Sequence, residues 1–266
     1  MKAFSIKQAL AAAIRAARAA GKVMRDNWRL PKRVKLTDAH DIKLELDVRC
    51  QKLIESVLRA AFPQIPLLGE EGDSGNVDAE RRWVVDPIDG TVNYFFGLPH
   101  AAVSIALQAR RPPSAARRHE TLLGVIYDPF TDELWTATRG GKTKLDGRVV
   151  RVSTHSRLSE AVIAMGFSKS KENLEKSLPH LNRLARRAKK IRILGSAALE
   201  LAYVASGRLD AYIERTINLW DVAAGGLMVE CSGGEFYLKP LPDGRFRMCA
   251  DNGKLRRKLQ LGSLLR

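Results

Sequence analysis

The chain has 266 residues, 45% of them hydrophobic, which is enough for one large domain or two closely packed ones around a sizeable core. No apolar run approaches the roughly 18 residues that a membrane span needs. Residues 1–5 lead into an amphipathic stretch instead of a secretory signal. We therefore expect a cytoplasmic protein with no membrane partner.

The formal net charge is +16, because 45 Lys and Arg residues outnumber 29 Asp and Glu residues. Such a charge is often seen in nucleic-acid binders. However, the basic residues form short scattered clusters without the interleaved aromatic side chains that single-strand binding needs. The pattern favours a basic surface that attracts anionic substrates, and it leaves a nucleic-acid or protein partner as the alternative.

The first elements along the chain are predicted from hydrophobic spacing. Apolar residues at helical spacing predict an amphipathic helix over residues 5–28. The polar and basic stretch 32–40 predicts a loop, and residues 41–47 alternate as a strand does. Asp47, at the end of that strand, opens a helix over residues 48–61 and is adequately explained as a helix cap.

The next two apolar segments deliver acidic residues into turns. One ends at Leu68 and leads to Glu70 in a glycine-flanked loop; the other ends at Val85 and is followed by a turn with Asp86 and Asp89. Asp-Pro and Asp-Gly are common turn dipeptides, so either alone is ordinary turn chemistry. Carboxylates at the mouth of a strand are nevertheless costly to bury unless a positive group meets them.

A helix start follows directly. Gly90 permits an unusual backbone angle, and residues 91–94 open a helix whose first N–H groups would face an anion. The stretch from Trp83 to Tyr94 therefore predicts a place that holds hard cations beside a phosphate.

The rest of the chain divides into a meander and a region where strands and helices alternate. The meander has strands at 101–107, 122–128, 133–138 and 147–152, with an exposed hairpin loop at 110–120. The alternating region has strands at 161–168, from 191 and at 211–214, helices at 171–189 and up to 206, then strands within 233–250 and a helix over 254–265. We place the boundary between an N-terminal α+β half, 1–153, and a C-terminal α/β half, 154–266, between these regions.

A third acidic turn lies in the second half. Asp221 follows two apolar residues and precedes a small-residue segment that reads as a helix start. Three acidic turns, each behind an apolar run, are hard to explain as independent accidents.

Together, the Gly-Glu-Glu turn at residues 69–71, the stretch W-V-V-D-P-I-D-G-T-V-N-Y at 83–94 and W-D-V-A-A-G at 220–225 resemble the inositol monophosphatase family. The resemblance extends from the first helix to Gly253. It implies a magnesium-dependent, lithium-sensitive phosphomonoesterase that forms a homodimer. It also implies an α+β fold, the layered αβαβα sandwich of the inositol monophosphatase and fructose-1,6-bisphosphatase type.

The resemblance also assigns metal ligands. Glu70, Asp86 and the backbone carbonyl of Ile88 would bind one Mg²⁺, and Asp86, Asp89 and Asp221 a second. A third, weaker ion near Glu70 is compatible with the family pattern. Two metals of this kind would clamp the attacking and leaving oxygens of a phosphate ester.

Further roles follow from matching positions. Glu70, or the pair of Thr91 and Asp47, would orient the attacking water or accept its proton, while the N–H groups of Gly90 and Thr91 hold the phosphate. Six residues would contact the hydroxyls of the substrate: Ser168, Gly195, Ser196, Ala197, Glu214 and Asp221. Asp221 is thus both a metal ligand and a substrate contact. For Glu214, an exposed acid at a strand end is the alternative.

The sequence therefore predicts Mg²⁺-dependent hydrolysis of a small phosphate monoester, with inositol monophosphate or a similar polyol phosphate first. The alternatives of the same chemistry are histidinol phosphate, a sugar bisphosphate or a nucleotide 3′-phosphate. A basic RNA- or protein-binding member of the fold is the alternative from another class, although such a binder gains nothing from four convergent carboxylates.

Overall fold

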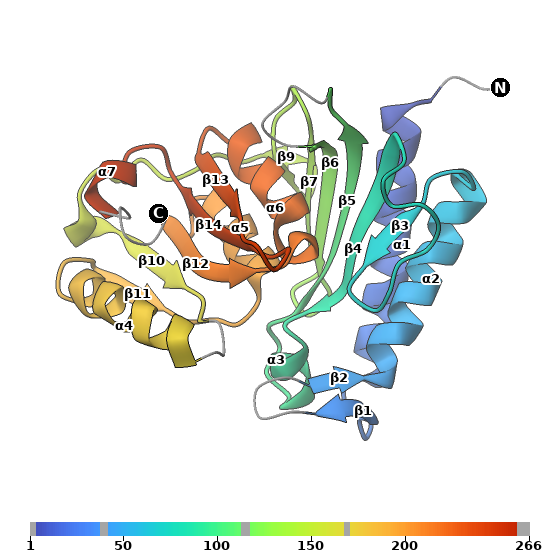
Figure 1. The fold of residues 1–266 in the computed structure, drawn as a ribbon, viewed down its shortest axis with the longest axis horizontal. Coiled ribbons are helices and arrows are strands. Elements are labelled where there is room, and N and C mark those ends of the chain that lie inside the picture. Colours follow the sequence, from blue (N-terminus) through green and yellow to red (C-terminus); the bar gives the residue numbers. More distant parts are fainter. Residues whose placement is uncertain (1–3, 38–41, 113–117, 168–170, 260–266) are drawn as a thin grey trace.

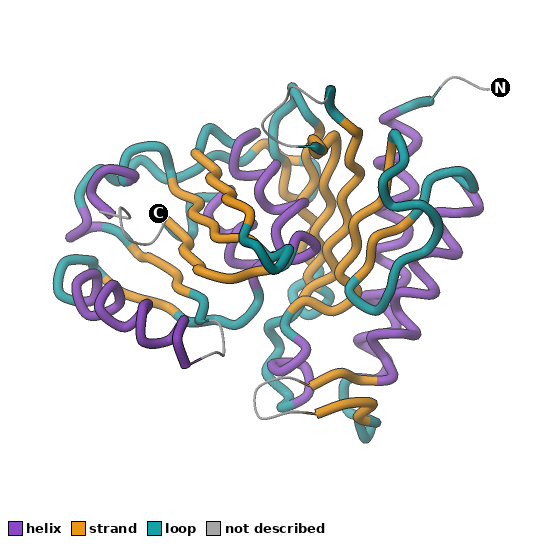
Figure 2. Tube along the Cα trace, in the orientation of Figure 1, coloured by secondary structure: helices purple, strands orange, loops and turns teal. Residues whose placement is uncertain are grey.

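The computed structural model describes residues 4–37, 42–112, 118–167 and 171–259 of the chain. Within these ranges the strands form three sheets, of seven, five and two strands. Figure 1 shows the two larger sheets on either side of a pair of helices, with other helices on their outer faces. Figure 2 shows the same layers as helices in purple and strands in orange. The order of layers is helix, sheet, helix, sheet, helix.

The seven-stranded sheet comes from the first half of the chain and runs in the order β3-β4-β5-β6-β7-β8-β9, with β3 parallel to β4 and the other neighbours antiparallel. The predicted meander is confirmed, but the strand expected over 147–152 is too long. Asp146 and Gly147, both at positive φ, make a tight hairpin that pairs only two residues on each side. The strands are β3 (Leu67–Gly69), β4 (Arg81–Asp89), β5 (Ala102–Arg110), β6 (His119–Asp128), β7 (Glu133–Thr138), β8 (Lys144–Leu145) and β9 (Arg148–Val149).

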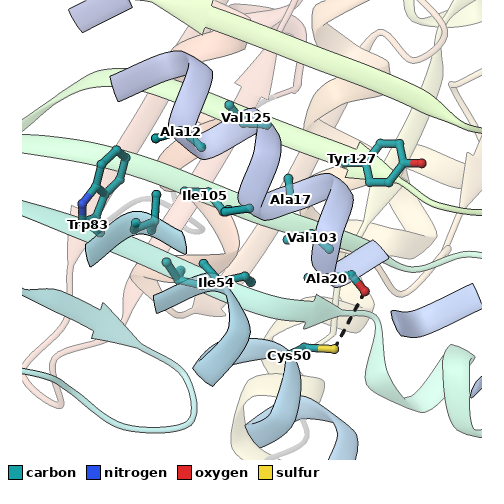
Figure 3. Packing of buried hydrophobic residues seen from close by; sticks show 14 of the residues in the cluster. Ala12, Ala17, Ala20, Cys50, Ile54, Trp83, Val103, Ile105, Val125 and Tyr127 are labelled. Carbon is teal, nitrogen blue, oxygen red and sulfur yellow. Dashed lines mark hydrogen bonds between the residues drawn. The ribbon is translucent and has the colours of Figure 1, made fainter. Parts of the chain in front are cut away.

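Two helices, α1 (Ile6–Asn27) and α2 (Glu45–Ala61), cover the outer face of this sheet. The helix predicted over 5–28 is confirmed, and its buried face is largely alanine. Figure 3 shows Ala12 and Ala17 of α1 close to Ile105 and Val125 of the sheet. Small side chains let the helix approach the strands closely, so the layer excludes water with little side-chain volume.

Two predictions about the segment before α2 and the start of that helix are wrong. Within the loop expected over 32–40, β1 (Val34–Thr37) pairs antiparallel with β2 (Ile42–Leu44); residues 38–40 lie outside the described ranges. The helix begins at Glu45, three residues earlier than expected, so Asp47 lies inside its first turn. There its Oδ2 accepts the Leu44 N–H at 2.7 Å, which stabilises the earlier start.

The prediction of an acidic turn directly after Val85 is also wrong, because β4 continues to Asp89. Its pairing with β5 shifts register between Asp86 and Asp89, around Pro87, which has no N–H for the ladder. In a regular strand, side chains three positions apart point to opposite faces. The irregularity removes this alternation, and both carboxylates reach the same site.

The five-stranded sheet comes from the second half and has the order β11-β10-β12-β14-β13, with β10 parallel to both of its neighbours. Helices α5 (Ala197–Ala205) and α6 (Leu219–Cys231) fill the layer between the two larger sheets. The remaining strands and helices are α3 (Thr91–Phe95), β10 (Val162–Met165), α4 (Lys171–Ala185), β11 (Lys190–Arg192), β12 (Ala211–Ile217), β13 (Glu235–Pro240), β14 (Phe246–Asp251) and α7 (Arg256–Leu259).

The outer helices of this half are shorter than predicted. The helix expected over 171–189 ends at Ala185, because the backbone then turns and residue 190 pairs with β10. The helix expected over 254–265 covers Arg256–Leu259, and residues from 260 lie outside the described ranges. No helix in the described part of the chain is long and apolar enough to cross a bilayer. The boundary between halves at residue 153 stays a prediction.

Candidate active site

A pocket of about 560 Å³ opens where the end of β4 and the start of α3 meet elements of the second half. Its walls hold nearly all of the predicted site residues that the structure describes; Asp47 lies behind the wall, and Ser168 lies outside the described residues. Among the lining residues are Glu70, Asp86, Ile88, Asp89, Gly90, Thr91, Asn93, Gly166, Gly195, Ser196, Ala197, Glu200, Tyr212, Glu214, Thr216, Asn218, Asp221 and Arg245.

Three carboxylates converge in this pocket. Asp86 and Asp89 of β4 and Asp221 of α6 each offer one oxygen, and these oxygens lie within 4.8 Å of one another. Asp86 and Asp89 are buried, and Asp221 is partly exposed. Residues more than 130 positions apart thus form one compact set of oxygen donors.

The buried carboxylate of Asp89 is held by the N-terminus of α5. Its Oδ2 accepts hydrogen bonds from the Ser196 hydroxyl and from the Ala198 N–H at 2.8 Å, and its Oδ1 accepts the Ala197 N–H at 3.2 Å. Burial raises the pKa of Asp89 to about 6, and these three donors counteract the rise. Ser196 and Ala197, predicted as substrate contacts, therefore also fix a carboxylate of the acidic cluster.

Asp86 has fewer donors and more acidic neighbours. Its Oδ1 accepts the Ile88 N–H at 3.0 Å, and the Glu70 carboxyl is within hydrogen-bonding reach. Burial and the charges of Glu70, Asp89 and Asp221 raise the pKa of Asp86 well above its usual value. Such crowding of carboxylates is unfavourable unless a cation or a proton enters.

Glu70 is positioned by its loop. Gln51 of α2 accepts the Glu71 N–H at 2.9 Å and donates to the Gly72 carbonyl at 2.7 Å. A Cβ at Gly69 would overlap the Gln51 side chain, so glycine is needed there for space. Gln51 was not predicted as part of the site, because an amide in a helix is ordinary surface chemistry.

Asp221 lies inside the first turn of α6, because the helix begins at Leu219 and not after Asp221 as predicted. Its Oδ2 accepts the Asn218 N–H at 2.9 Å, which closes the start of the helix. Burial and the charges of Asp89 and Glu70 raise the pKa of Asp221 well above its usual value. The helix start and the acidic cluster therefore share one carboxylate.

Thr91, at the first position of α3, lies between two acceptors. Its hydroxyl donates to the Ile88 carbonyl at 2.8 Å and is 3.5 Å from Oδ1 of Asp47. The second distance is at the long limit of a hydrogen bond. The structure thus places Thr91, Asp47 and Ile88 together, with the hydroxyl turned towards Ile88.

Asn93 joins the two halves of the site, a role that the sequence analysis did not assign. Its Nδ2 donates to the Leu194 carbonyl at 2.7 Å and to the His100 carbonyl at 2.9 Å. Gly90, at φ 89°, passes so close that a Cβ would be 2.9 Å from the His100 carbonyl oxygen and 3.2 Å from that of Gly195. The position of Asn93 in the D-G-T-V-N stretch was the signal available for its role.

Glu214 lies within β12, which continues to Ile217, so the strand end expected at Glu214 is wrong. The side chain is partly exposed and lines the pocket. Glu200 of α5 and Tyr212 of β12 also line it, and neither was predicted as a site residue. Arg245, from the turn between β13 and β14, also lines the pocket with its positive charge. No local sequence pattern predicted this position.

Comparisons with known proteins place the chain. A family model described as the inositol monophosphatase family matches residues 5–239. An inositol-1-monophosphatase of Rhizobium meliloti is 40% identical over 203 residues, which are 76% of this chain and 73% of the relative. A protein named Nus factor SuhB of Escherichia coli is 37% identical over 226 residues, 84% of this chain and 82% of the relative.

Solved structures agree in fold. The extragenic suppressor protein SuhB of Bartonella henselae superposes with a TM-score of 0.85 at 34% identity, covering 96% of this chain and 97% of the other. Inositol monophosphatase of Anabaena superposes with a TM-score of 0.81 at 33% identity, covering 96% and 94%. These matches confirm the predicted layered α+β sandwich.

Sequence and structure thus lead to the same assignment. The family is metal-dependent in general, its members act on phosphorylated small molecules, and the acidic cluster stands where its motifs place it. The chain belongs to the inositol monophosphatase family and is a phosphoric monoester hydrolase.

Proposed function

We propose that the protein hydrolyses inositol monophosphate, or a similar small polyol phosphate, with Mg²⁺ bound in the acidic cluster. The observation that carries this proposal is the convergence of Asp86, Asp89 and Asp221 within 4.8 Å. The motif residues Glu70 and Thr91 line the same pocket. Histidinol phosphate, a sugar bisphosphate and a nucleotide 3′-phosphate are the other substrates that the same chemistry would serve.

The donor set fits Mg²⁺. Carboxylate and carbonyl oxygens are the ligands that this hard cation prefers. The pKa values of Asp86 and Asp221 are raised by burial and then by neighbouring negative charge, which a cation would balance. Asp89 keeps acceptor capacity for a metal, because its three hydrogen bonds use three of about four lone-pair positions on a carboxylate. Glu70, Asp86 and the Ile88 carbonyl would hold one ion, and Asp86, Asp89 and Asp221 a second, with a third near Glu70.

Bound there, Mg²⁺ would lower the pKa of water and offset the charge of the phosphate. The Thr91 hydroxyl now donates to the Ile88 carbonyl at 2.8 Å. A cation bound to that carbonyl would compete with this hydrogen bond. The hydroxyl could then donate to Asp47, 3.5 Å away, and help orient a water for attack. Asp47 or Glu70 would accept the proton.

The phosphate itself would be held by the start of α3. The first N–H groups of a helix have no partner inside it, so they are available to an anion. Gly90, the N-cap of α3, and Thr91 supply the backbone at this point. Glu214 and the turn at Gly195, on the other wall, would meet the hydroxyls of the substrate.

A substrate panel with purified protein tests the proposal. Initial rates of phosphate release from inositol 1-phosphate, histidinol phosphate, fructose 1,6-bisphosphate and a nucleotide 3′-phosphate are compared with Mg²⁺ and with EDTA. We expect the highest kcat/KM for inositol 1-phosphate and no turnover in EDTA. A metal-independent rate, or a clear preference for another ester, would contradict the proposal or its substrate.

Two family traits belong to the same proposal. Lithium is expected to inhibit uncompetitively, which initial rates at several LiCl and substrate concentrations would show. The homodimer is tested by the mass in solution from light scattering.

Nucleic-acid binding is a second candidate function, favoured by one end of the second half. Figure 1 places α4, β11 and α7 together at the end of the molecule away from α1 and α2. The Arg183 side chain donates to the Leu259 carbonyl at 3.4 Å and ties α4 to α7. Seven exposed cations belong to this basic face: Arg186, Arg187, Lys189, Lys190, Lys254, Arg257 and Lys258.

The cations of the basic face carry charge that no neighbouring acid balances among the described residues. None of its seven cations forms an ion pair with an acid in the described part of the chain. Lys254 and Lys258 instead donate to backbone carbonyls of residues 154 and 156. Relatives that carry the name Nus factor SuhB are 37–40% identical to this chain, which adds to the case for a partner beyond the substrate.

A salt series separates the two functions. Binding of a short RNA is measured from 50 to 200 mM salt, a range over which phosphate contacts lose roughly 10³-fold or more in affinity. Replacing Arg187 and Lys190 by Glu is expected to weaken binding and leave phosphatase turnover unchanged. Binding that ignores both salt and these substitutions would contradict a role for the basic face.

A further inference from the structure

A chain of three side chains runs along the pocket wall behind Glu214. Tyr212 and Glu214 are two positions apart on β12, so they share a face of the sheet. The Tyr212 hydroxyl donates to Oε2 of Glu214 and is also within hydrogen-bonding reach of the Glu200 carboxyl from α5. Oε1 of Glu200 accepts the Leu194 N–H at 3.0 Å. Every member therefore has a polar partner.

The donor order runs towards Glu214. Glu200 and Tyr212 are each only 1% exposed. Burial raises the pKa of Glu200 to about 8, so at neutral pH this carboxyl carries a proton that it can donate to the Tyr212 oxygen. The Tyr212 hydrogen is then committed to Glu214, because a phenol has one hydrogen to give. A neutral acid at the buried end thus orients a carboxylate at the pocket end.

Gly166 also borders the Glu214 carboxyl. A Cβ built on this residue would overlap the Glu214 carboxyl. The backbone of Gly166 does not have positive φ, so space and not conformation explains the glycine. Its N–H is paired with the Ile213 carbonyl at 3.0 Å, which holds the contact in place. Glu214 is consequently confined by both Tyr212 and Gly166.

Resting on the proposed function, we propose that Tyr212 and Glu200 are positioning residues that hold the Glu214 carboxylate ready to accept a hydrogen bond from a substrate hydroxyl near the phosphate. They act through Glu214 and do not touch the reacting atoms. Specificity for a polyol over a simple ester would then depend on buried groups, since an unmet hydrogen bond in such a site is costly.

The primary test is Tyr212→Phe, assayed with Mg²⁺ on inositol 1-phosphate and on p-nitrophenyl phosphate, which has no hydroxyl beside its ester. We expect KM for inositol 1-phosphate to rise roughly 5- to 10-fold, the range of one hydrogen bond, with kcat within about twofold. KM for the aryl ester should not change. Tyr237→Phe on β13, outside the pocket, is the matched control.

A double-mutant cycle with Glu214→Gln tests whether Tyr212 acts through Glu214. If it does, the double variant should have the KM of Glu214→Gln alone; independent residues would multiply their effects. Gly166→Ala should reproduce the KM rise by displacing the carboxylate. Thermal unfolding of each variant shows that the fold is retained.

Glu200 is tested by two replacements of similar size. Glu200→Leu is expected to raise KM for inositol 1-phosphate. Glu200→Gln can still accept from Leu194 and donate to Tyr212, so its KM should stay close to that of the unmodified protein. Equal KM changes on both substrates, or multiplicative effects in the cycle, would overturn the positioning role alone. No turnover of either ester by the unmodified protein would overturn the proposed function together with it.

Discussion

The two helical layers that cover the seven-stranded sheet are built in different ways. α1 and α2, on the outer face, keep a polar side in solvent, and the buried face of α1 is mostly alanine. α5 and α6, between the sheets, are apolar on nearly all sides because strands cover both of their faces. The outer layer supports the site from behind, through Asp47 and Gln51 of α2, whereas the inner layer lines the pocket itself.

The difference shows where an apolar helix can carry chemistry. Apart from Glu200, the polar groups of the inner layer that reach the pocket lie at helix starts, where backbone N–H groups have no partner within the helix. The start of α5 binds the carboxylate of Asp89, and the start of α6 holds that of Asp221. Acidic groups can therefore be buried there at a lower cost than elsewhere in the core.

The largest difference between the two helical layers is expected when one acidic residue in each layer is replaced by asparagine. Asp221→Asn removes a metal-binding oxygen and should reduce turnover by more than roughly 10³-fold, while the metal-free protein becomes equally or more stable because a crowded charge is lost. Asp26→Asn on α1, an exposed acid paired with Lys22, should leave turnover unchanged and change the free energy of unfolding by about 0.5 kcal/mol or less. Steady-state rates and urea unfolding measure both; near-normal turnover of Asp221→Asn with Mg²⁺ would break the assignment.

The outer layer has one predicted share in catalysis, through Asp47 of α2. Thr91→Ala removes the hydroxyl 3.5 Å from Asp47 and should lower kcat by roughly 10²-fold while raising KM much less. Kinetics on inositol 1-phosphate measure the split. An unchanged kcat would leave Thr91 as a helix-start residue and the outer layer as scaffold only.

Packing should also distinguish the layers. A Cβ at Gly124 on β6 would lie 2.8 Å from the Ala224 carbonyl oxygen and 2.9 Å from its Cα in α6, so Gly124→Ala must move backbone and should cost about 2–3 kcal/mol. At Gly21 in α1 the nearest atoms belong to the Tyr127 side chain and not to backbone, and alanine gains about 1 kcal/mol of helix propensity. Gly21→Ala should therefore cost less, as urea unfolding would show; the reverse order would contradict this reading of the two interfaces.

Glu200 makes the stability of the protein depend on pH. Its pKa is raised from 4.5 to about 8 by burial, so between these pH values the unfolded chain has lost a proton that the folded protein keeps. The contribution of Glu200 to stability is then full below pH 4.5 and falls as pH rises to 8, at a limiting slope of about 1.4 kcal/mol per pH unit.

Comparison with Glu200→Gln isolates this effect, because the variant has the same acidic cluster but no ionisable group at position 200. The stability difference between the two proteins, measured by urea unfolding at several pH values, should move in favour of the variant as pH rises. A difference that does not depend on pH would show that Glu200 titrates normally.

The smallest effect is expected on the exposed side of the outer layer. Lys22 and Asp26 of α1 form an exposed i,i+4 ion pair at 2.5 Å. Lys22→Ala should change the free energy of unfolding by about 0.5 kcal/mol or less, since exposed pairs are weak. A larger loss in urea unfolding would mean that this side of α1 is not simply solvated.

Much of the site could be predicted from short stretches of sequence. The outer helix α1 followed from its spacing, and Glu70, Asp86, Asp89 and Asp221 were found because each follows an apolar run in a local pattern. Local patterns failed where pairing decides the outcome. Residues 34–37 form a strand only because β2 lies beside them, and Asp86 and Asp89 remain in β4 because β5 continues to pair with it.

Contacts between distant parts of the chain were decided by the tertiary structure alone. Ser196 binds Asp89 across 107 positions, and Asn93 reaches Leu194 across 101. Glu200 and Tyr212 were not predicted as site residues, because nothing in their neighbouring residues shows that the two side chains lie in one hydrogen-bonded chain with Glu214. A motif encodes which groups are available, whereas their hydrogen bonds depend on how two sheets close around α5 and α6, a property that no short stretch contains.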